Sequence, residues 1–220
     1  EDQRVARCQR QLREEFLERV RTMLREDQQP KWPVLEARLR RVKTMHWGIL
    51  AGEMVDLIVI LDRMRLDDAT NDAIAEAVEA YRTNLDAALA ARNDVLESTA
   101  SAVADARRVS DDARLNTLLA RQFDLHRAVR DVNGGYVEEI ASLMPTETAS
   151  AFRVEFGKRA FPRLYGPTRL MQLFASARAR ELEPEQSEAL ELLAVEYEAE
   201  RASMRDRLQR RLWIDCLLYT

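Results

Sequence analysis

The amino-acid sequence predicts an all-α fold, and three observations support this prediction. The 220-residue chain contains six Gly and six Pro, whereas Ala, Leu, Glu and Arg dominate, which is typical of long helices. Apolar side chains recur with a period of about 3.6 residues along most of the chain. A pattern of helix, break and helix in the first half recurs faintly in the second. We expect about seven to eight helices, several of them long, including two related helical hairpins packed as an elongated bundle.

The pattern divides the chain into five segments. They are an N-terminal amphipathic helix (1–29), a first helical hairpin unit (30–106), connecting helices (107–161), a second helical hairpin unit (162–215) and a non-native tail (216–220).

The first helix is expected from about Gln3 to Glu26, with an apolar stripe on one face. The stripe consists of Val5, Leu12, Phe16, Val20, Met23 and Leu24. Pro30 and Pro33 end this helix because proline lacks a backbone N–H donor. Pro33 also suits the first turn of a second helix, which is expected to end near Met45.

A buried helix and a long amphipathic helix should follow a short transition at Gly48–Gly52. The apolar residues between about Glu53 and Met64 predict the buried helix. Asp67 or Asp68 should cap the long helix, because a carboxylate can accept hydrogen bonds from free N–H groups in a first helical turn. The long helix is expected from about residue 69 to residue 97, or as far as 106.

The connecting segment should begin with a turn and cap at Ser110-Asp111-Asp112. The helix after it crosses Asn133-Gly134-Gly135, and the continuing apolar pattern favours one kinked helix over two separate helices. Pro145 should start a short helix, and residues 161–167 are predicted to form a loop. The second hairpin unit then has helices at about 168–180 and 184–213.

The two hairpin units are related by a spacing of 116 residues. Four residues of the first copy have identical counterparts 116 positions later. Leu57, Leu66, Ala73 and Tyr81 correspond to Leu173, Leu182, Ala189 and Tyr197. In each copy an apolar helix ends in a short polar break, and a longer amphipathic helix follows. Because the identities are few, the shared pattern carries more weight than the matching residues.

The break in the second copy, Leu182-Glu183-Pro184-Glu185-Gln186, is the best-defined local motif. Glu183 stands at the N-cap position, Pro184 at the first helical position, and Gln186 where a capping-box side chain reaches back. Helix initiation alone explains these residues.

The same motif resembles the LTxxQ element of small bacterial periplasmic stress proteins, the Spy and CpxP group with its zinc-resistance relatives. Members of that family have two such motifs in a curved all-helical fold; some are ATP-independent chaperones or stress regulators, and others bind metal. Here Glu183 replaces the threonine of the motif, and the first copy, Leu66 to Thr70, keeps only the leucine. The chain also resembles uncharacterised bacterial helical proteins at Trp32-Pro33, Glu53 and the 161–165 loop, a likeness that implies no function.

No motif for catalysis or for a cofactor is found in the sequence. There is no nucleophile elbow, P-loop or dinucleotide fingerprint, so we expect no catalytic residues, no cofactor and no enzyme activity. Lys43 and Phe123 precede His46 and His126 by three residues, which excludes a di-iron bundle with paired Glu-x-x-His motifs. His46, beside Met45, is the one residue considered as a soft-metal ligand, although core packing and capping is the favoured interpretation.

Charge argues against nucleic acid as a partner. The net charge of −4 comes from 34 basic and 38 acidic residues, and both signs are interleaved through most of the chain, as on solvated helix faces. The one local basic cluster consists of Arg38, Arg40, Arg41 and Lys43. It could contact an acidic partner or anionic lipid headgroups, but a solvated helix face is the favoured interpretation.

The sequence predicts no transmembrane helix, because the longest apolar stretch, Gly48 to Leu61, is shorter than the ~20 residues that span a bilayer. Residues 216–220 resemble a translated sequencing adaptor, so the genuine sequence is expected to stop near Asp215, with the real C-terminus missing. Cys8 and Cys216 stand at opposite ends of the chain and indicate neither a zinc knuckle nor a disulfide framework.

The leading functional prediction is a non-enzymatic extracytoplasmic protein, chaperone-like or stress-related, that binds a protein partner or unfolded clients. The alternative is a structural scaffold that oligomerises through its long helices. The periplasmic resemblance favours the extracytoplasmic location. The chain starts at Glu1 without a Met, so a removed signal peptide and an incomplete clone are both open. Without such a signal peptide, a cytoplasmic location is expected.

Overall fold

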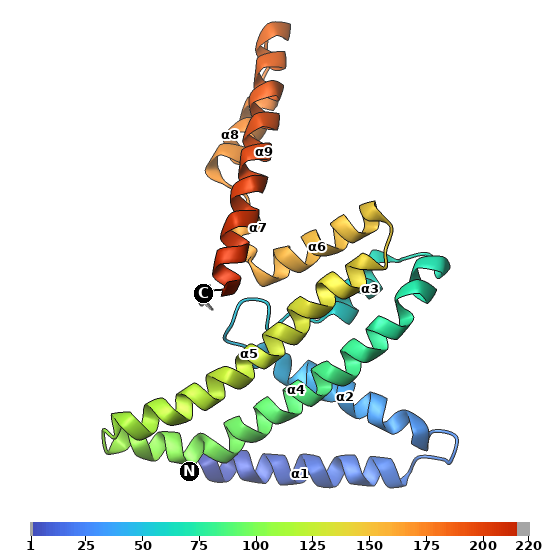
Figure 1. Ribbon diagram of the computed structural model, residues 1–220, viewed down its shortest axis with the longest axis vertical. Helices are drawn as coiled ribbons and strands as arrows, with labels where there is room; N and C mark the ends of the chain where they lie inside the picture. Colours follow the sequence, from blue (N-terminus) through green and yellow to red (C-terminus); the bar gives the residue numbers. More distant parts are fainter. Residues whose placement is uncertain (1, 215–220) are drawn as a thin grey trace. The chain divides into compact units, whose positions relative to one another are not determined.

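The computed structural model describes residues 2–214, which form an all-α protein and contain no β-strand (Figure 1). The all-α prediction is confirmed. The helices form two compact units, of which the first ends at Lys43 and the second begins at Thr44. The predicted non-native tail, with Cys216, lies outside the described residues. None of the described helices is long and apolar enough to cross a bilayer.

The first unit consists of two α-helices joined by a turn. Helix α1 spans Asp2–Thr22, the 3-10 turn η1 spans Gln29–Lys31, and α2 spans Trp32–Thr44. The first helix thus ends before Glu26, where the sequence predicted its end. Pro30 is the second residue of η1, and its lack of a backbone N–H prevents it from continuing the hydrogen-bond ladder of a preceding helix.

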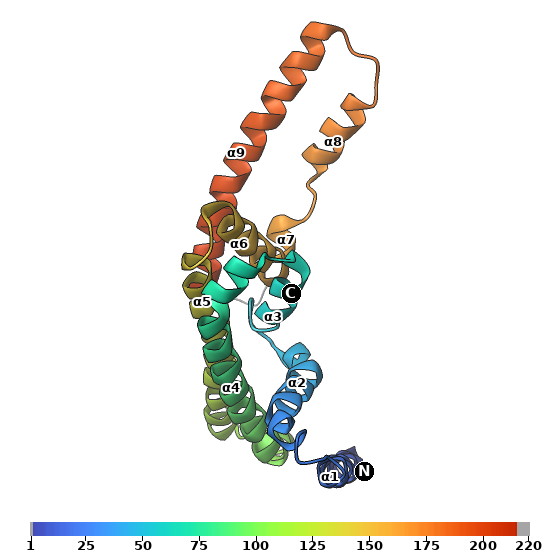
Figure 2. The ribbon, with the colours of Figure 1, turned by 90° about the vertical axis from the view of Figure 1, so that its right-hand side faces the viewer.

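The second unit is built on a long antiparallel pair, α4 (Asp68–Arg108) and α5 (Asp112–Ser142), which lie side by side in Figures 1 and 2. The side chain of Asp67 caps α4 by accepting from the Thr70 N–H, and that of Asp111 caps α5 by accepting from the Arg114 N–H. Both caps agree with the sequence prediction. Helix α5 also runs through Asn133-Gly134-Gly135 as one helix.

Helix α3 spans Leu57–Met64, so the prediction that it begins at Glu53 is wrong. Gly52 has φ +83°, a left-handed conformation that a helix does not contain and that glycine adopts without strain. Asp56 then caps α3 by accepting from the Ile58 N–H at 3.0 Å. The segment before Asp56 is therefore a turn, although its side chains are mostly apolar.

Helix α6 (Thr146–Ala160) packs on α3 and α5, and α7 (Pro162–Tyr165) follows it directly. The prediction of a loop at 161–167 is wrong for the four residues of α7. Pro162 occupies the first helical position, where its missing N–H costs nothing, and the carbonyl of Phe161 accepts from the Leu164 N–H at 2.9 Å. Phe161 itself is fully buried in the core.

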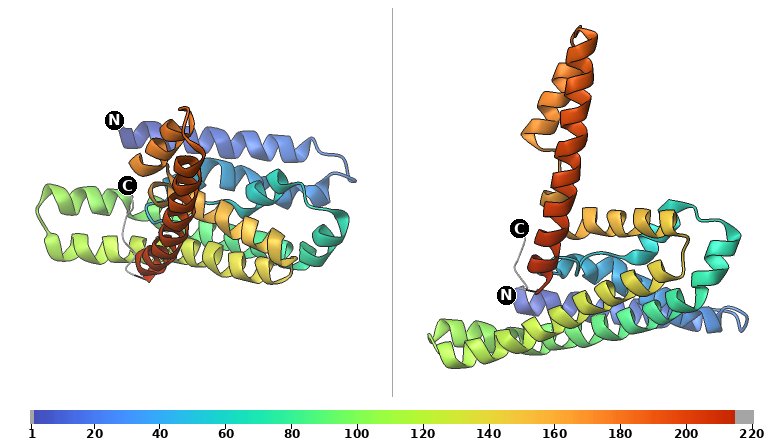
Figure 3. Two further views of the ribbon diagram at one scale, coloured as in Figure 1. Left: turned by 90° about the horizontal axis from the view of Figure 1, so that it is seen from above. Right: turned by 45° about the horizontal axis from the view of Figure 1, so that its top comes forward.

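Helices α8 (Arg169–Arg178) and α9 (Pro184–Ile214) form a hairpin that extends away from α3 to α7 (Figures 1 and 2). The C-terminal half of α9 returns to the core beside α7, as Figure 3 also shows. Helices α4 and α9 begin 116 residues apart, in agreement with the internal repeat. The packing of the two copies differs, because Leu57 is fully buried whereas Leu173 is 56% exposed.

Candidate functional site

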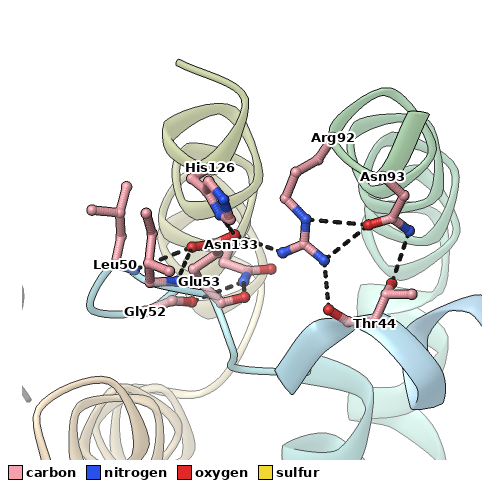
Figure 4. Close-up of polar contacts among 9 residues, drawn as sticks. Thr44, Leu50, Gly52, Glu53, Arg92, Asn93, His126 and Asn133 are labelled. Atoms are coloured by element: carbon pink, nitrogen blue, oxygen red, sulfur yellow. Dashed lines mark hydrogen bonds and ion pairs between the residues drawn. The ribbon is translucent and has the colours of Figure 1, made fainter. Parts of the chain in front are cut away.

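Glu53 is the centre of a buried polar network between the turn before α3 and the α4–α5 pair (Figure 4). Its Oε1 accepts from Arg92 Nη1 at 2.6 Å and lies 2.6 Å from His126 Nδ1. Its Oε2 accepts from the backbone N–H groups of Ile49 and Leu50 at 2.8 and 3.1 Å. Each carboxylate oxygen therefore has two polar partners.

Arg92 connects this carboxylate to Thr44, the first residue of the second unit. Its side chain is fully buried on α4, and Nη2 donates to the carbonyl of Thr44. Asn93 supports the same contact, because its Oδ1 accepts from Arg92 Nε at 3.3 Å and its Nδ2 donates to Thr44 Oγ1 at 3.0 Å. The guanidinium is thus held by charge-assisted hydrogen bonds on two sides.

Asn133 holds the backbone of the same turn from α5. Its Nδ2 donates to the carbonyls of Gly52 and Glu53 at 2.9 and 3.1 Å. Its Oδ1 accepts from the hydroxyl of Tyr81 at 3.0 Å, and that hydroxyl accepts from the Leu57 N–H at 3.2 Å. The start of α3 is therefore fixed to both α4 and α5.

The charge state of Glu53 follows from these contacts. Burial alone would raise the pKa of its carboxyl, but the hydrogen bonds from His126 and Arg92 outweigh burial and hold this pKa below its ordinary value of 4.5. The group is therefore ionised at neutral pH. Because its side chain is fully buried with both oxygens engaged, the network suits fixing the turn rather than contacting a substrate.

The structure places His46 away from this network, in the 3-10 turn η2 (Met45–Trp47). Its ring is exposed and meets the Trp47 ring edge-on, with 5.9 Å between the centroids. Among the side chains that the structure describes, no group of three or more His, Cys, Asp or Glu is placed to hold a metal ion.

The predicted basic cluster lies on α2. Arg38 and Lys43 are exposed, Arg40 is half-buried with a guanidinium nitrogen 3.9 Å from Glu36, and Arg41 is buried. The four side chains therefore differ in their access to solvent, so they do not present one uniform cationic surface.

The Leu182 to Gln186 motif forms the turn between α8 and α9. Oε1 of Gln186 accepts from the Glu183 N–H at 3.2 Å, so the Gln186 side chain reaches back to the N-cap as the sequence predicts. Leu182 is half-buried, and the other four residues of the motif are exposed. Helix initiation thus accounts for the contacts of this motif.

Helix α9 carries apolar residues on two opposite sides. The side toward α8 includes Ala194, which is buried, and Tyr197, whose ring packs against Phe174 with 5.9 Å between the centroids. The opposite side carries an outer seam, defined here as Leu192, Val195 and Ala199. Leu192 is 62% exposed and Val195 is 67% exposed, and Ala199 is also exposed. Their spacing of three and four residues places them on one stripe of the helix.

The charges of α9 are also separated into two blocks. From Glu185 to Glu200 the helix has six Glu and no Lys or Arg, whereas from Arg201 to Arg211 it has five Arg and one Asp. This order agrees with the helix dipole, whose positive end is at the N-terminus. It also gives the helix an acidic half and a basic half.

Sequence reasoning missed both the Glu53 network and the outer seam. For Glu53 the signal was a charged residue inside an apolar run, and for the seam it was the second apolar stripe of α9.

Comparisons of the chain with protein-family models, with curated proteins and with solved structures found no match. The resemblance to the LTxxQ proteins therefore stays a prediction.

Proposed function

We propose that this protein is a non-enzymatic assembly module, which binds a second copy of itself through the outer seam of α9. One observation carries the proposal: α9 is apolar on two opposite sides, and α8 covers one of them. A helix with apolar residues around its circumference is normally buried. Burial of Leu192 and Val195 against a partner helix would remove their apolar surface from water.

The charge blocks of α9 favour a second copy as the partner. Most homodimers have two-fold symmetry, in which the same surface of each chain faces the other. If two α9 helices pack antiparallel along their seams, the two-fold axis lies near Val195, so the first acidic turns of each helix, with Glu185 and Glu188, lie beside the start of the basic half of the other, from Arg201. A parallel arrangement would instead place like charges together, which is unfavourable.

The test is sedimentation equilibrium of the wild-type protein and of a Leu192→Glu/Val195→Glu variant. We expect a wild-type dimer and a monomeric variant with an unchanged far-UV circular dichroism spectrum. Dimerisation of the variant would bury two glutamate charges in the seam of each chain, which is unfavourable, whereas the helix itself tolerates both substitutions. Val109→Glu is the matched control, since Val109 is 62% exposed at the α4–α5 turn. This control should remain dimeric. A wild-type protein that is monomeric at high micromolar concentration would contradict the proposal.

Binding of unfolded clients is the second candidate function, in an extracytoplasmic compartment. Exposed leucines on both helices of the hairpin, Leu170, Leu173, Leu192 and Leu193, favour it, as does the resemblance to the stress proteins. It predicts a monomer that suppresses aggregation of a denatured model protein at substoichiometric to equimolar amounts. The Leu192→Glu/Val195→Glu variant should then lose this activity. No suppression by the wild-type protein over that range would exclude this function.

A further inference from the structure

A cavity of about 830 Å³ lies between α5, α6, α7 and the C-terminal half of α9. Its volume is within the range of about 300–1,000 Å³ that is typical of small-molecule sites. Apolar side chains form much of its wall, including Val137, Val154, Phe156 and Trp213. The cavity therefore offers an apolar surface that could hold a hydrocarbon chain or a ring.

Arginines are the cationic groups of this cavity. Arg153, Arg205 and Arg210 line it together with two carboxylates, Glu138 and Asp206. The Arg153 guanidinium pairs with Glu138 at 2.8 Å, so these two charges largely offset each other. The remaining charges, two Arg against one Asp, leave a net positive charge that suits a monoanion.

Arg205 has a buried donor that no side chain satisfies. Its guanidinium stacks on the Tyr165 ring, 4.4 Å from the centroid, which fixes the plane of the group. Its Nε is shielded from solvent and has no hydrogen-bond partner among the described residues. By contrast, Arg201, one turn earlier on α9, donates to the carbonyl of Gly166 at 2.7 Å. Because this Nε is shielded even from water, a ligand in the cavity would meet the Nη groups of Arg205, which lines the cavity.

We propose that this cavity binds an amphipathic organic anion, a carboxylate with a hydrocarbon chain or ring. The carboxylate would accept charge-assisted hydrogen bonds from Arg205, and the apolar part would lie against Phe156 and Trp213. A carboxylate fits because it is planar, carries one negative charge and can accept two parallel hydrogen bonds from a guanidinium. This site is separate from the outer seam and does not depend on the proposed dimer.

The test is isothermal titration calorimetry with dodecanoate, kept below its micelle concentration. We expect saturable binding near one molecule per chain, and clearly weaker binding of dodecylamine, which has the same chain and the opposite charge. Arg205→Met should weaken dodecanoate binding about ten-fold or more, because it removes the charged donors and keeps an apolar side chain of similar length. Arg207→Met is the control on the same helix, since Arg207 is exposed and does not line the cavity.

A second variant tests the position of the hydrocarbon chain. Val154→Trp should fill part of the cavity and abolish dodecanoate binding while the circular dichroism spectrum stays unchanged. The same titrations on the monomeric Leu192→Glu/Val195→Glu variant should give wild-type affinity, which separates this site from the proposed dimer. The proposal is overturned if dodecanoate does not bind saturably, if dodecylamine binds equally well, or if Arg205→Met binds dodecanoate as tightly as Arg207→Met.

Discussion

Replacement of Glu53 with Gln should lower the free energy of unfolding by about 3–5 kcal/mol, because it leaves a buried charge without its partner. Arg92 is fully buried, and its guanidinium lies 2.6 Å from the carboxylate. A glutamine amide has one acceptor oxygen, so two of the present donors would face an NH₂ group. Chemical denaturation followed by circular dichroism measures the change.

Glu76→Gln is the matched control for this variant, because it makes the same chemical change at an exposed position of α4. A substitution on the surface should change the free energy of unfolding by less than about 0.5 kcal/mol. Equal effects of Glu53→Gln and Glu76→Gln would show that the buried ion pair does not stabilise the fold.

Acid should remove the same stabilisation. The pKa of Glu53 is lower in the folded protein than its ordinary value of 4.5, so the folded state favours the ionised carboxyl. Its contribution is therefore complete above pH 4.5 and is lost as the pH falls through the folded pKa. Denaturation at a series of pH values should show the wild-type protein and Glu53→Gln converging in stability below pH 4.5. A difference between them that stays constant down to strongly acidic pH would contradict the ionised state of Glu53.

Local signals in the sequence were enough to predict the long helices. The caps at Asp67 and Asp111 use side chains within three residues of the N–H groups that they bind, so they can be read from neighbouring residues. The same is true of Gln186, which bonds to the Glu183 N–H. The apolar pattern of α4 can also be recognised from neighbouring residues, because apolar side chains recur every three to four residues on the face that packs on the core.

The Glu53 site could not be predicted in this way, since its partners are distant in the sequence. Arg92 and His126 lie 39 and 73 residues away from Glu53. The run from Gly48 to Leu61 is apolar enough for a helix, and the sequence pattern does not show that a distant arginine neutralises the acid within it. The turn therefore forms where tertiary contacts outweigh the local helical preference.

The outer seam shows a different limit of sequence reasoning. A stripe such as Leu192, Val195 and Ala199 has the same spacing whether another helix of the chain covers it or not. Its exposure depends on where α8 packs, and α8 packs on the side of Tyr197. The sequence can therefore predict that α9 is apolar on two sides, but the structure is needed to identify the uncovered one.

Gly134→Ala and Gly135→Ala should change stability in opposite directions, although the two glycines are neighbours in α5. In a helix interior, Ala is more favourable than Gly by about 1 kcal/mol. A Cβ at position 135 would meet no atom within 4 Å, so Gly135→Ala should stabilise the protein by about 0.5–1 kcal/mol. Thermal and chemical denaturation of both variants measures the effects.

A Cβ at position 134 would overlap the indole of Trp213, which also lies close to Gly52. Movement of the ring would disturb its contacts with Phe156 and Phe161 and with the guanidinium of Arg130, 5.0 Å from the ring centroid. Gly134→Ala should therefore destabilise the protein by about 1–3 kcal/mol, despite its better helix propensity.

A double-mutant cycle separates this overlap from any effect on the helix itself. Trp213→Phe replaces the indole with a smaller ring, so Gly134→Ala should cost much less in that background than in the wild-type protein. Gly135→Ala should have the same effect in both backgrounds, since position 135 does not contact Trp213. If Gly134→Ala lowered the free energy of unfolding equally in the wild-type and Trp213→Phe backgrounds, the backbone of α5, and not the indole, would require the glycine. The expected coupling would instead show that Gly134 is needed for packing. Glycine is unfavourable for helix α5, but its lack of a side chain leaves space for the indole of Trp213, which packs the end of α9 against the core.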